Sequence, residues 1–245
     1  MTRPSAPDLH LETEFGADRP SYVRARPPYP DAVIDFLVGA TSPPTDIVDL
    51  GAGTGLAAGA LAQRGHVVMA VEPDETMARE LRGRTGVCWI KAHAEATGLP
   101  SQCADHVVCA QSFHWFDAVA ALAEVRRLLR PQGVLSVLWR SLDLKDPTTR
   151  RFSAFRIEML GPPKDRVTRL SIDSFVQSQF RPTAEAHFAA PFRVDAQTVL
   201  DYLASQRNCA RHLDNSETVA AAFRRTFGLD AVVLCSDINV IRFCL

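Results

Sequence analysis

The sequence predicts a doubly wound α/β fold with a mostly parallel, seven-stranded sheet and an antiparallel edge strand. Short apolar strand patterns alternate with helix patterns over the first 140 residues. The first strand runs into three alternating glycines, and apolar residues make up 47% of the chain, enough for a full core. Successive strand–helix units imply right-handed crossovers, so the strands run parallel and helices cover both faces of the sheet.

The expected elements of the core follow one another from residue 31 onward. Asp31 is expected to cap a helix through Leu37, Pro73 to open the helix after the second strand, and Asp117 to cap the helix after the fourth strand. An alanine-rich helix after the first strand runs through Leu61. The first five strands are expected at residues 47–50, 67–71, 87–90, 106–110 and 134–139.

The chain divides into four segments. Residues 1–20 are polar and contain prolines, which predicts a flexible N-terminal arm, and residues 21–140 form the core. Residues 141–183 carry apolar side chains at helical spacing, so we expect a helical lid inserted over the ligand edge of the sheet. Residues 184–245 complete the core, with strands at 187–194 and 238–243, the second of them at the edge, and helices near 196–205 and 216–227.

Bulk composition narrows the function classes. A formal net charge of −1 argues against a phosphate-backbone binder, so no nucleic acid partner is expected. The sequence has neither a run of 18 apolar residues nor an apolar N-terminal signal, so we expect a cytoplasmic protein with no membrane partner. The six cysteines contain no C-x-x-C pair, so no metal site is expected.

The glycine-rich turn after the first strand is the main binding motif. Asp49 precedes Gly51, Gly53 and Gly55, and Glu72 ends the second strand. Glycines let the backbone approach a ligand closely, and a carboxylate at the end of the second strand can accept hydrogen bonds from both hydroxyls of a ribose. The G-x-G-x-G form suits a ligand without a pyrophosphate, although the spacing alone does not exclude a dinucleotide.

Three sequence blocks carry a resemblance to a known family. They are Tyr22-x-x-x-Arg26-Pro27-x-Tyr29-Pro30, then Val48 to Gly55 with Val71-Glu72-Pro73 and Met77, and finally Ala110 to Asp117. On these blocks the chain resembles class I S-adenosylmethionine (SAM)-dependent methyltransferases, and within them the small-molecule group that includes trans-aconitate and cantharidin-type methyltransferases. The resemblance covers about residues 15–140. It implies a Rossmann-like core, SAM as cofactor and S-adenosylhomocysteine as its product.

The resemblance also implies roles for the matching positions. Asp49 and the glycines would surround the methionine part of SAM, Glu72 would bind the ribose, and Gln111 would lie near the methionine end. Pro73 and Met77 would line the adenine slot, with Ala94 and Glu95 beside it. The implied cofactor-binding residues are therefore Asp49, Gly51, Gly53, Gly55, Glu72, Pro73, Met77, Ala94, Glu95 and Gln111.

A second set of residues is expected at the acceptor. Tyr22, Arg26, Tyr29 and Trp115 are the candidate substrate-binding residues. Arg26 could bind a substrate carboxylate through two hydrogen bonds, or it could brace the N-terminal arm. His114 is the candidate catalytic residue, a general base for a phenol, amine or alcohol; a carboxylate nucleophile needs none.

The function predicted from the sequence is methyl transfer to an O, N or C nucleophile, a carboxylate included, of a small organic molecule, in keeping with specialised metabolism. The block after the fourth strand lacks the Asn/Asp-Pro-Pro-Tyr/Phe signature of enzymes that methylate base amines. Two alternatives stay open at this point. The chain could use SAM for another outcome, such as cyclisation, or bind SAM without catalysis. A nicotinamide oxidoreductase is the weakest reading.

Overall fold

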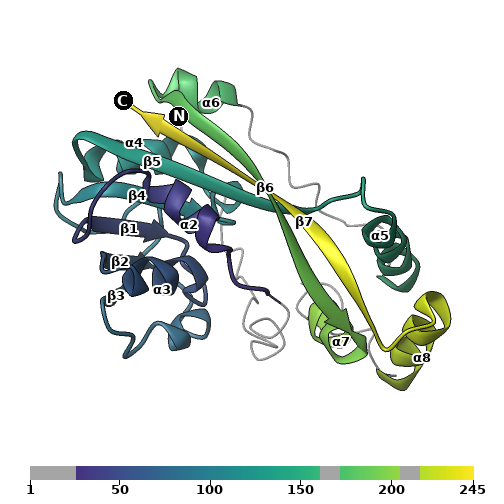
Figure 1. The fold of residues 1–245 in the computed structure, drawn as a ribbon. Helices are drawn as coiled ribbons and strands as arrows, with labels where there is room; N and C mark the ends of the chain where they lie inside the picture. Colours follow the sequence, from purple (N-terminus) through teal and green to yellow (C-terminus); the bar gives the residue numbers. More distant parts are fainter. Residues whose placement is uncertain (1–25, 161–171, 205–215) are drawn as a thin grey trace, which may run out of the picture.

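The computed structural model describes residues 26–160, 172–204 and 216–245, and it is organised around one twisted sheet (Figure 1). The sheet has seven strands in the order β3-β2-β1-β4-β5-β7-β6. The predicted fold class is confirmed. The antiparallel strand is the last in the chain, as expected, but it pairs with β5 on one side and β6 on the other, so β6 is the outermost strand. The strands are β1 Asp46–Leu50, β2 Val67–Val71, β3 Val87–Ile90, β4 Ala104–Ala110, β5 Leu129–Leu142, β6 Arg181–Asp195 and β7 Ala231–Cys244.

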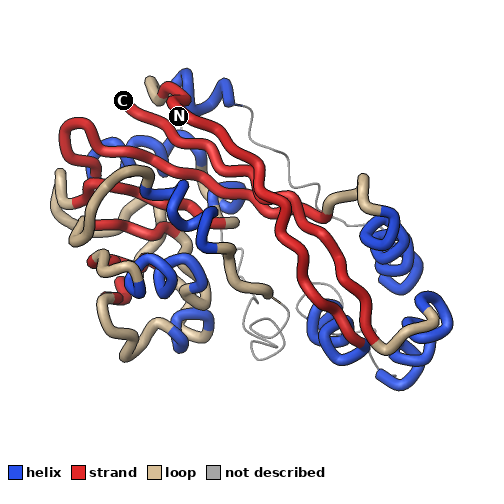
Figure 2. The backbone as a smooth tube through the Cα atoms, viewed as in Figure 1, coloured by secondary structure: helices blue, strands red, loops and turns tan. Residues whose placement is uncertain are grey.

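Helices cover both faces of the sheet (Figure 2). Helices α2 and α3 pack on one face, and α4 with α6 packs on the other. The side chains of β5 show the alternation, because Leu135 and Val137 lie in the core on the α4 side and Leu138 lies in the core under α2 and α3. The helices are α2 Asp31–Val38, α3 Leu56–Gln63, α4 Ala118–Leu128, α5 Pro147–Leu160, α6 Ile172–Gln177, α7 Ala196–Ala204 and α8 Ser216–Phe227, with short 3-10 helices η1 Met77–Glu80 and η2 Phe113–Trp115.

Two of the three expected helix starts differ from the prediction. The Asp117 side chain does cap α4, accepting a hydrogen bond from the Ala120 N–H at 3.0 Å. Asp31 is the first residue of α2 rather than its cap, and its carboxylate pairs with Arg64 of the α3 C-cap at 2.7 Å. Pro73 opens no full helix: Asp74 binds the N–H groups of Thr76 and Met77 in a tight turn, and only η1 follows.

The last two strands, β6 and β7, form an antiparallel pair that is much longer than predicted. We call this pair the β6–β7 hairpin, although helices α7 and α8 lie between its two strands in the sequence. Its pairing runs from Arg181 opposite Cys244 to Asp195 opposite Ala231. The predicted strands, 187–194 and 238–243, cover only part of this hairpin, because many residues outside them are exposed or polar. The hairpin and the end of β5 reach beyond the other parallel strands toward α5, α7 and α8 (Figure 1).

The expected lid, residues 141–183, is divided between two places. Helix α5 packs with α7 and α8 around Phe152, Phe155 and Phe223, in a third apolar cluster that lies past the carboxyl ends of the strands. Helix α6 packs instead on the α4 face, where Phe175 contacts Phe113 and stacks on Phe243 of β7. Residues 161–171, between these helices, lie outside the described residues, as does the expected arm at residues 1–20.

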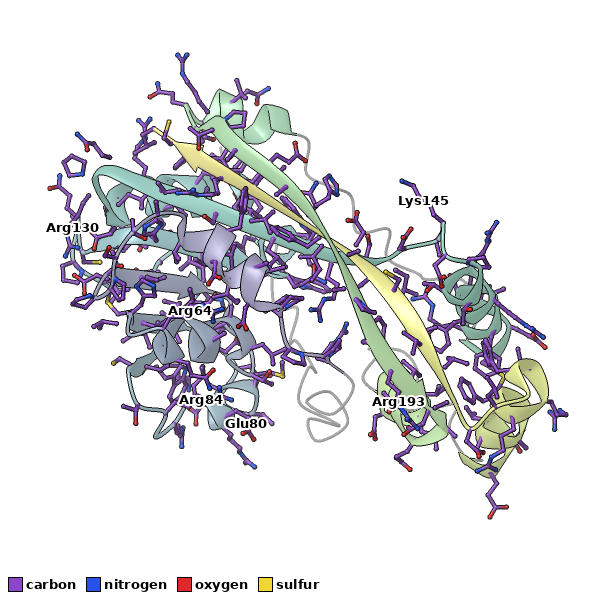
Figure 3. The ribbon with its side chains drawn as sticks, viewed as in Figure 1. Arg64, Glu80, Arg84, Arg130, Lys145 and Arg193 are labelled. Atoms are coloured by element: carbon purple, nitrogen blue, oxygen red, sulfur yellow. The ribbon has the colours of Figure 1, made fainter. Side chains whose placement is uncertain are left out.

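The amino edge of the sheet is held by charged side chains. Arg130, at the start of β5, pairs with Asp46 of β1 at 2.8 Å and with Asp105 of β4 at 2.9 Å. Figure 3 places Arg130 at the opposite end of the molecule from Arg193, which lies near α7. These half-exposed pairs contribute modestly to stability. They fix the alignment of three strands at the edge opposite to the one that carries the motifs.

Replacing Phe243 by alanine should destabilise the fold strongly. The Phe243 ring is fully buried and stacks on Phe175 with ring centroids 4.5 Å apart. Loss of a buried phenylalanine costs about 3–5 kcal/mol of unfolding free energy. Urea unfolding followed by circular dichroism would measure this change. Leu245→Ala is the control, because that side chain is 48% exposed and its loss should cost less than about 0.5 kcal/mol. Equal effects of the two changes would contradict the packing described here.

Candidate cofactor and acceptor site

The sequence motifs meet where the strand order reverses. β1 pairs in parallel with β2 on one side and with β4 on the other, so the loops after β1 and β4 leave the sheet side by side. In open α/β sheets this switch point, at the carboxyl ends of the strands, is the usual ligand site. Residues from 49 to 55, from 72 to 77 and from 111 to 115 all gather there.

The three glycines of the first loop differ in what surrounds them. All have positive φ, from +57° to +79°. A Cβ on Gly51 would lie 2.6 Å from the Cβ of Ser112, and one on Gly55 would overlap Leu81. A Cβ on Gly53 would meet only the Met77 methyl group, at 3.6 Å. Packing therefore requires Gly51 and Gly55, while Gly53 and Met77 border the place where a ligand can approach the backbone.

Glu72 ties the end of β2 to this loop. Its carboxylate accepts the Gly53 N–H at 2.8 Å through one oxygen and the Asp74 N–H at 3.0 Å through the other. Burial raises the pKa of Glu72, and these two N–H donors oppose the rise. Each carboxylate oxygen can accept a second hydrogen bond. Two ribose hydroxyls could therefore bind here without displacing the backbone contacts.

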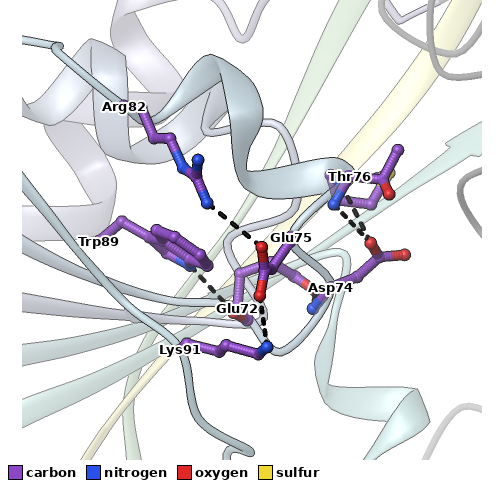
Figure 4. A network of polar contacts seen from close by, with 8 residues as sticks. Glu72, Asp74, Glu75, Thr76, Arg82, Trp89 and Lys91 are labelled. Carbon is purple, nitrogen blue, oxygen red and sulfur yellow. Dashed lines mark hydrogen bonds and ion pairs between the residues drawn. The ribbon is translucent and has the colours of Figure 1, made fainter.

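A network behind Glu72 fixes its backbone (Figure 4). The Trp89 indole N–H donates to the Glu72 carbonyl oxygen at 3.0 Å, and the Arg82 guanidinium lies 4.7 Å from the centre of the Trp89 ring. Glu75 pairs with Arg82 at 3.4 Å and also with Lys91. The Trp89 bond ties the end of β2 to β3 and so holds the Glu72 backbone, whereas the Glu75 pairs lie at the exposed surface.

Asp49 is the most unusual group at the site. Its side chain is buried, and neither carboxylate oxygen has a hydrogen-bond partner among the described residues. Burial raises the pKa of Asp49 to about 7; the nearby Ala58 N–H opposes the rise without meeting hydrogen-bond geometry, and the Glu72 carboxylate adds to it. A buried carboxyl with no partner is costly. A cationic or hydrogen-bond-donating ligand would remove that cost.

The loop after β4 packs directly on the glycine turn. Gln111 has a positive φ of +59°, and its side-chain amide donates to the Arg140 carbonyl oxygen at 3.0 Å. Ser112 donates to the Leu50 carbonyl oxygen at 2.6 Å. His114 lies next in η2, with its ring tilted by 43° to the Trp115 ring and the ring centroids 5.1 Å apart, and burial lowers the pKa of its imidazole. Trp115 is half exposed.

The proline-rich segment is held against the end of β5 by an arginine that the sequence reasoning missed. Arg140 donates to the carbonyl oxygens of Pro27 and Pro28, at 2.6 and 3.0 Å, and stacks over the Tyr29 ring at 4.7 Å. Burial is the main cause that lowers the pKa of Arg140, and the positive charge of the nearby Arg26 lowers it further. The signal was available, because Arg140 directly follows the fifth predicted strand, 134–139, at the ligand edge.

The loop expected beside the adenine is anchored to α4. Glu95 accepts the Asp117 N–H at 2.9 Å, and Glu124 accepts both the N–H and the hydroxyl of Thr97. Ala94 is buried, and Pro73 is partly buried after β2. The structure thus brings ten implied cofactor residues to one edge. Tyr22 lies outside the described residues.

These observations match the chemistry of SAM. The open side of Gly53 beside Met77 suits a flat base and sugar, Glu72 suits the two ribose hydroxyls, and the unpartnered carboxyl of Asp49 suits a cationic methionine end. In the described part of the chain there is no cluster of metal-ligating side chains. Among the described helices, none is long and apolar enough to cross a membrane.

Comparisons with known proteins agree on one family. A family described as "Methyltransferase domain" matches residues 48–137. An uncharacterized methyltransferase of Mycobacterium tuberculosis is 32% identical over 204 residues, covering 81% of this chain and 79% of its own length. A methyltransferase-like protein of Schizosaccharomyces pombe is 34% identical over 155 residues, covering 60% and 59% of the two chains. A solved structure from Anaeromyxobacter dehalogenans, named for an inferred type II methyltransferase, superposes with a TM-score of 0.64 at 26% identity, covering 89% and 96%.

The affinity for SAM should rise with pH through the titration of Asp49. The Asp49 carboxyl, with a pKa of about 7, is neutral below that pH and ionised above it, and the ionised form attracts the cationic ligand. Between pH 6 and 7.5 the ionised fraction grows roughly tenfold, and so should the association constant. Calorimetric titration of SAM at several pH values would measure this. Asp49→Asn should remove the pH dependence; a wild-type affinity that stays constant over this range would contradict the prediction.

Proposed function

This chain belongs to the methyltransferase family, and we propose that it methylates an O, N or C nucleophile of a small organic molecule. The chain is a class I SAM-dependent methyltransferase, and SAM is its cofactor. The observation that supports the site most directly is the packing of the β4 loop on the glycine turn, where Ser112 meets Gly51. That contact brings His114 and Trp115 to the same edge as Glu72.

The proposed division of labour follows from these contacts. Asp49 and the three glycines hold the methionine part, Glu72 holds the ribose, and Met77 with Pro73 flanks the adenine, beside Ala94 and Glu95. Gln111 lies at the methionine end, where Arg140 fixes its side chain. Tyr22, Arg26, Tyr29 and Trp115 remain the candidate acceptor residues.

Bound SAM supplies an electrophilic methyl group on a positively charged sulfur. The protein therefore has to orient the acceptor atom and exclude water rather than supply a strong nucleophile. Because burial lowers the pKa of His114, its imidazole stays neutral at physiological pH and can take a proton from a hydroxyl or amine acceptor. His114 Nδ1 is buried and has no hydrogen-bond partner among the described residues.

The finer assignments are also part of the proposal. The near-neutral charge supports a small acceptor over a nucleic acid, and a cytoplasmic location is in keeping with the sequence. The likeness to trans-aconitate and cantharidin-type enzymes and a role in specialised metabolism rest on the motif blocks alone. Use of SAM for cyclisation, or binding without turnover, would differ from the proposal in the product formed.

Removing the Glu72 carboxylate should weaken cofactor binding strongly. Glu72→Ala loses two charge-assisted hydrogen bonds to the ribose, which corresponds to a loss of roughly hundredfold or more in affinity. Calorimetric titration of SAM and S-adenosylhomocysteine into both proteins would measure it. Glu75→Ala is the matched control. This exposed carboxylate lies three residues away, and its ion pairs among the described residues are with Arg82 and Lys91 at the surface, so the affinity should stay close to that of the wild type.

The same proteins test turnover. With methyl-labelled SAM and a panel of small acceptors, the label should appear on an acceptor as S-adenosylhomocysteine forms. Label that stays on a cofactor-derived fragment would favour a non-methyl reaction. Binding without turnover on any acceptor would favour a non-catalytic protein, and equal losses in Glu72→Ala and Glu75→Ala would contradict the assigned site.

His114→Ala should reduce the turnover of hydroxyl or amine acceptors by 10²–10⁴-fold, roughly the contribution of a general base. The wild-type rate should fall as pH drops through the pKa of His114, which lies below the ordinary value of 6.5, because protonation removes the base. The variant should lack this acid limb while binding SAM normally. Rate measurements from pH 5 to 8 would test this, and an unchanged profile in the variant would remove the base role.

A further inference from the structure

A row of polar side chains crosses the three last strands of the sheet beside the proposed site. Trp139 of β5 is paired with Asn239 of β7, which is paired with His187 of β6. Directly paired residues of antiparallel strands point to the same face, with Cβ atoms about 5 Å apart. Trp139 packs against the apolar core on the α4 side, so the row lies on that face.

The position of the row relates it to the methyl-transfer site. The Gln111 N–H donates to the Leu138 carbonyl oxygen at 2.9 Å, directly before Trp139. Trp139 therefore lies one residue beyond the end of β4, on the strand next to the loop that carries His114. The row begins at the loop expected to hold the methionine end of SAM and leads away from it across the sheet.

Hydrogen bonds fix the orientation of the Asn239 side chain. Its Nδ2 donates to Glu185 Oε1 at 2.7 Å and lies 2.8 Å from His187 Nε2, while His187 Nδ1 lies 3.1 Å from both oxygens of Asp237. A carboxylate only accepts, so the Asn239 group that faces Glu185 is the NH₂, and His187 carries its proton on Nδ1. Both Nδ2 hydrogens of Asn239 are thus used, and Oδ1 is directed elsewhere.

Two complementary groups in the row have no partner. Asn239 is only 6% exposed, and its Oδ1 accepts no hydrogen bond among the described residues. The indole N–H of Trp139, on the adjacent strand, is likewise buried and donates to no group in the described part of the chain. A buried polar group left unpaired destabilises the folded protein. An unmet acceptor and an unmet donor on two directly paired residues of adjacent strands indicate a ligand that satisfies both of them.

We propose that Trp139 and Asn239 bind a neutral hydroxyl group of the methyl acceptor. The Trp139 N–H donates to the hydroxyl oxygen, and the hydroxyl hydrogen is donated to Asn239 Oδ1. A carboxylate has no hydrogen to give Asn239, and Glu185 and Asp237 beside the row would repel it. An ammonium has no lone pair for the indole N–H. The inference rests on the proposed function and narrows its substrate class.

The other members of the row act through Asn239. Glu185 and His187 hold its NH₂, and Asp237 holds His187, so these three are positioning residues rather than contacts of the acceptor. Both side-chain partners of Nδ2 must be in place to keep Oδ1 directed away from them, so the network fixes a nearly buried asparagine from the exposed side chains of β6.

The test uses phenol as probe and the indole N–H of Trp139 as reporter. The chain has three tryptophans, so protein labelled with ¹⁵N in the indole ring gives three indole signals, and Trp139→Phe identifies one of them. In the presence of S-adenosylhomocysteine, phenol should shift the Trp139 signal saturably. The Trp89 signal should stay fixed, because its N–H is already bonded to Glu72. Toluene and benzoate, which match phenol in shape, should bind at least tenfold more weakly.

Asn239→Leu should abolish the response to phenol and keep the affinity for S-adenosylhomocysteine. The comparison of phenol with toluene needs only the wild-type protein, so it holds even where the variant does not fold. An equal response to phenol and toluene, or no response to either, would overturn the proposal and leave the row filled by water or by packing. Failure of the wild type to bind S-adenosylhomocysteine would instead count against the proposed function.

Discussion

The approach of Gly51 to Ser112 is the constraint on which the site depends. No side chain fits between the loops after β1 and β4, because a Cβ on Gly51 would lie 2.6 Å from the Cβ of Ser112. The Ser112 hydroxyl closes the contact by donating to the Leu50 carbonyl oxygen. The strand order reverses between β1 and β4, so the loops after these two strands leave the sheet side by side. The contact between Gly51 and Ser112 packs the two loops together at one edge, where a ligand can bind.

Two buried carboxylates give that edge its chemical character, and they do so in different ways. Glu72 is satisfied by the N–H groups of Gly53 and Asp74 and is held from behind by Trp89, so it is a rigid acceptor that is already in position. Asp49 has no such partners in the part of the chain that the structure describes, and its raised pKa leaves it divided between two protonation states near neutral pH. A carboxylate held rigidly, such as Glu72, favours a ligand whose hydroxyls match its position. A carboxyl that titrates near neutral pH, such as Asp49, releases its proton when a cationic ligand binds.

The acceptor side is built from elements that are distant in sequence. Arg140 joins the proline-rich segment to Gln111, and the β6–β7 hairpin adds Asn239 and His187 to the same sheet. The helices α5, α7 and α8 at the far end of the hairpin have their own apolar cluster, separate from the two cores that pack on the sheet. These helices are therefore stabilised by packing that does not involve the glycine turn.

The sequence by itself determined the alternation of strands and helices, the glycine turn, Glu72 and the block after the fourth strand. The alternation follows from local apolar periodicity, the turn follows from glycines that can take a positive φ, and the other two are residue types at the ends of predicted strands. The sequence predicted β2 and β3 to the residue. It did not predict the short η1, where Asp74 binds the next N–H groups, or the length of the hairpin, where residues 181–186 of β6 are mostly exposed and Ser236 and Asp237 interrupt the apolar pattern of β7. The Arg140 clamp, the unpartnered state of Asp49 and the row from Trp139 to His187 were decided only by the tertiary structure. Hydrogen-bond satisfaction and burial are properties of neighbours in space, and those neighbours come from segments up to 113 residues apart.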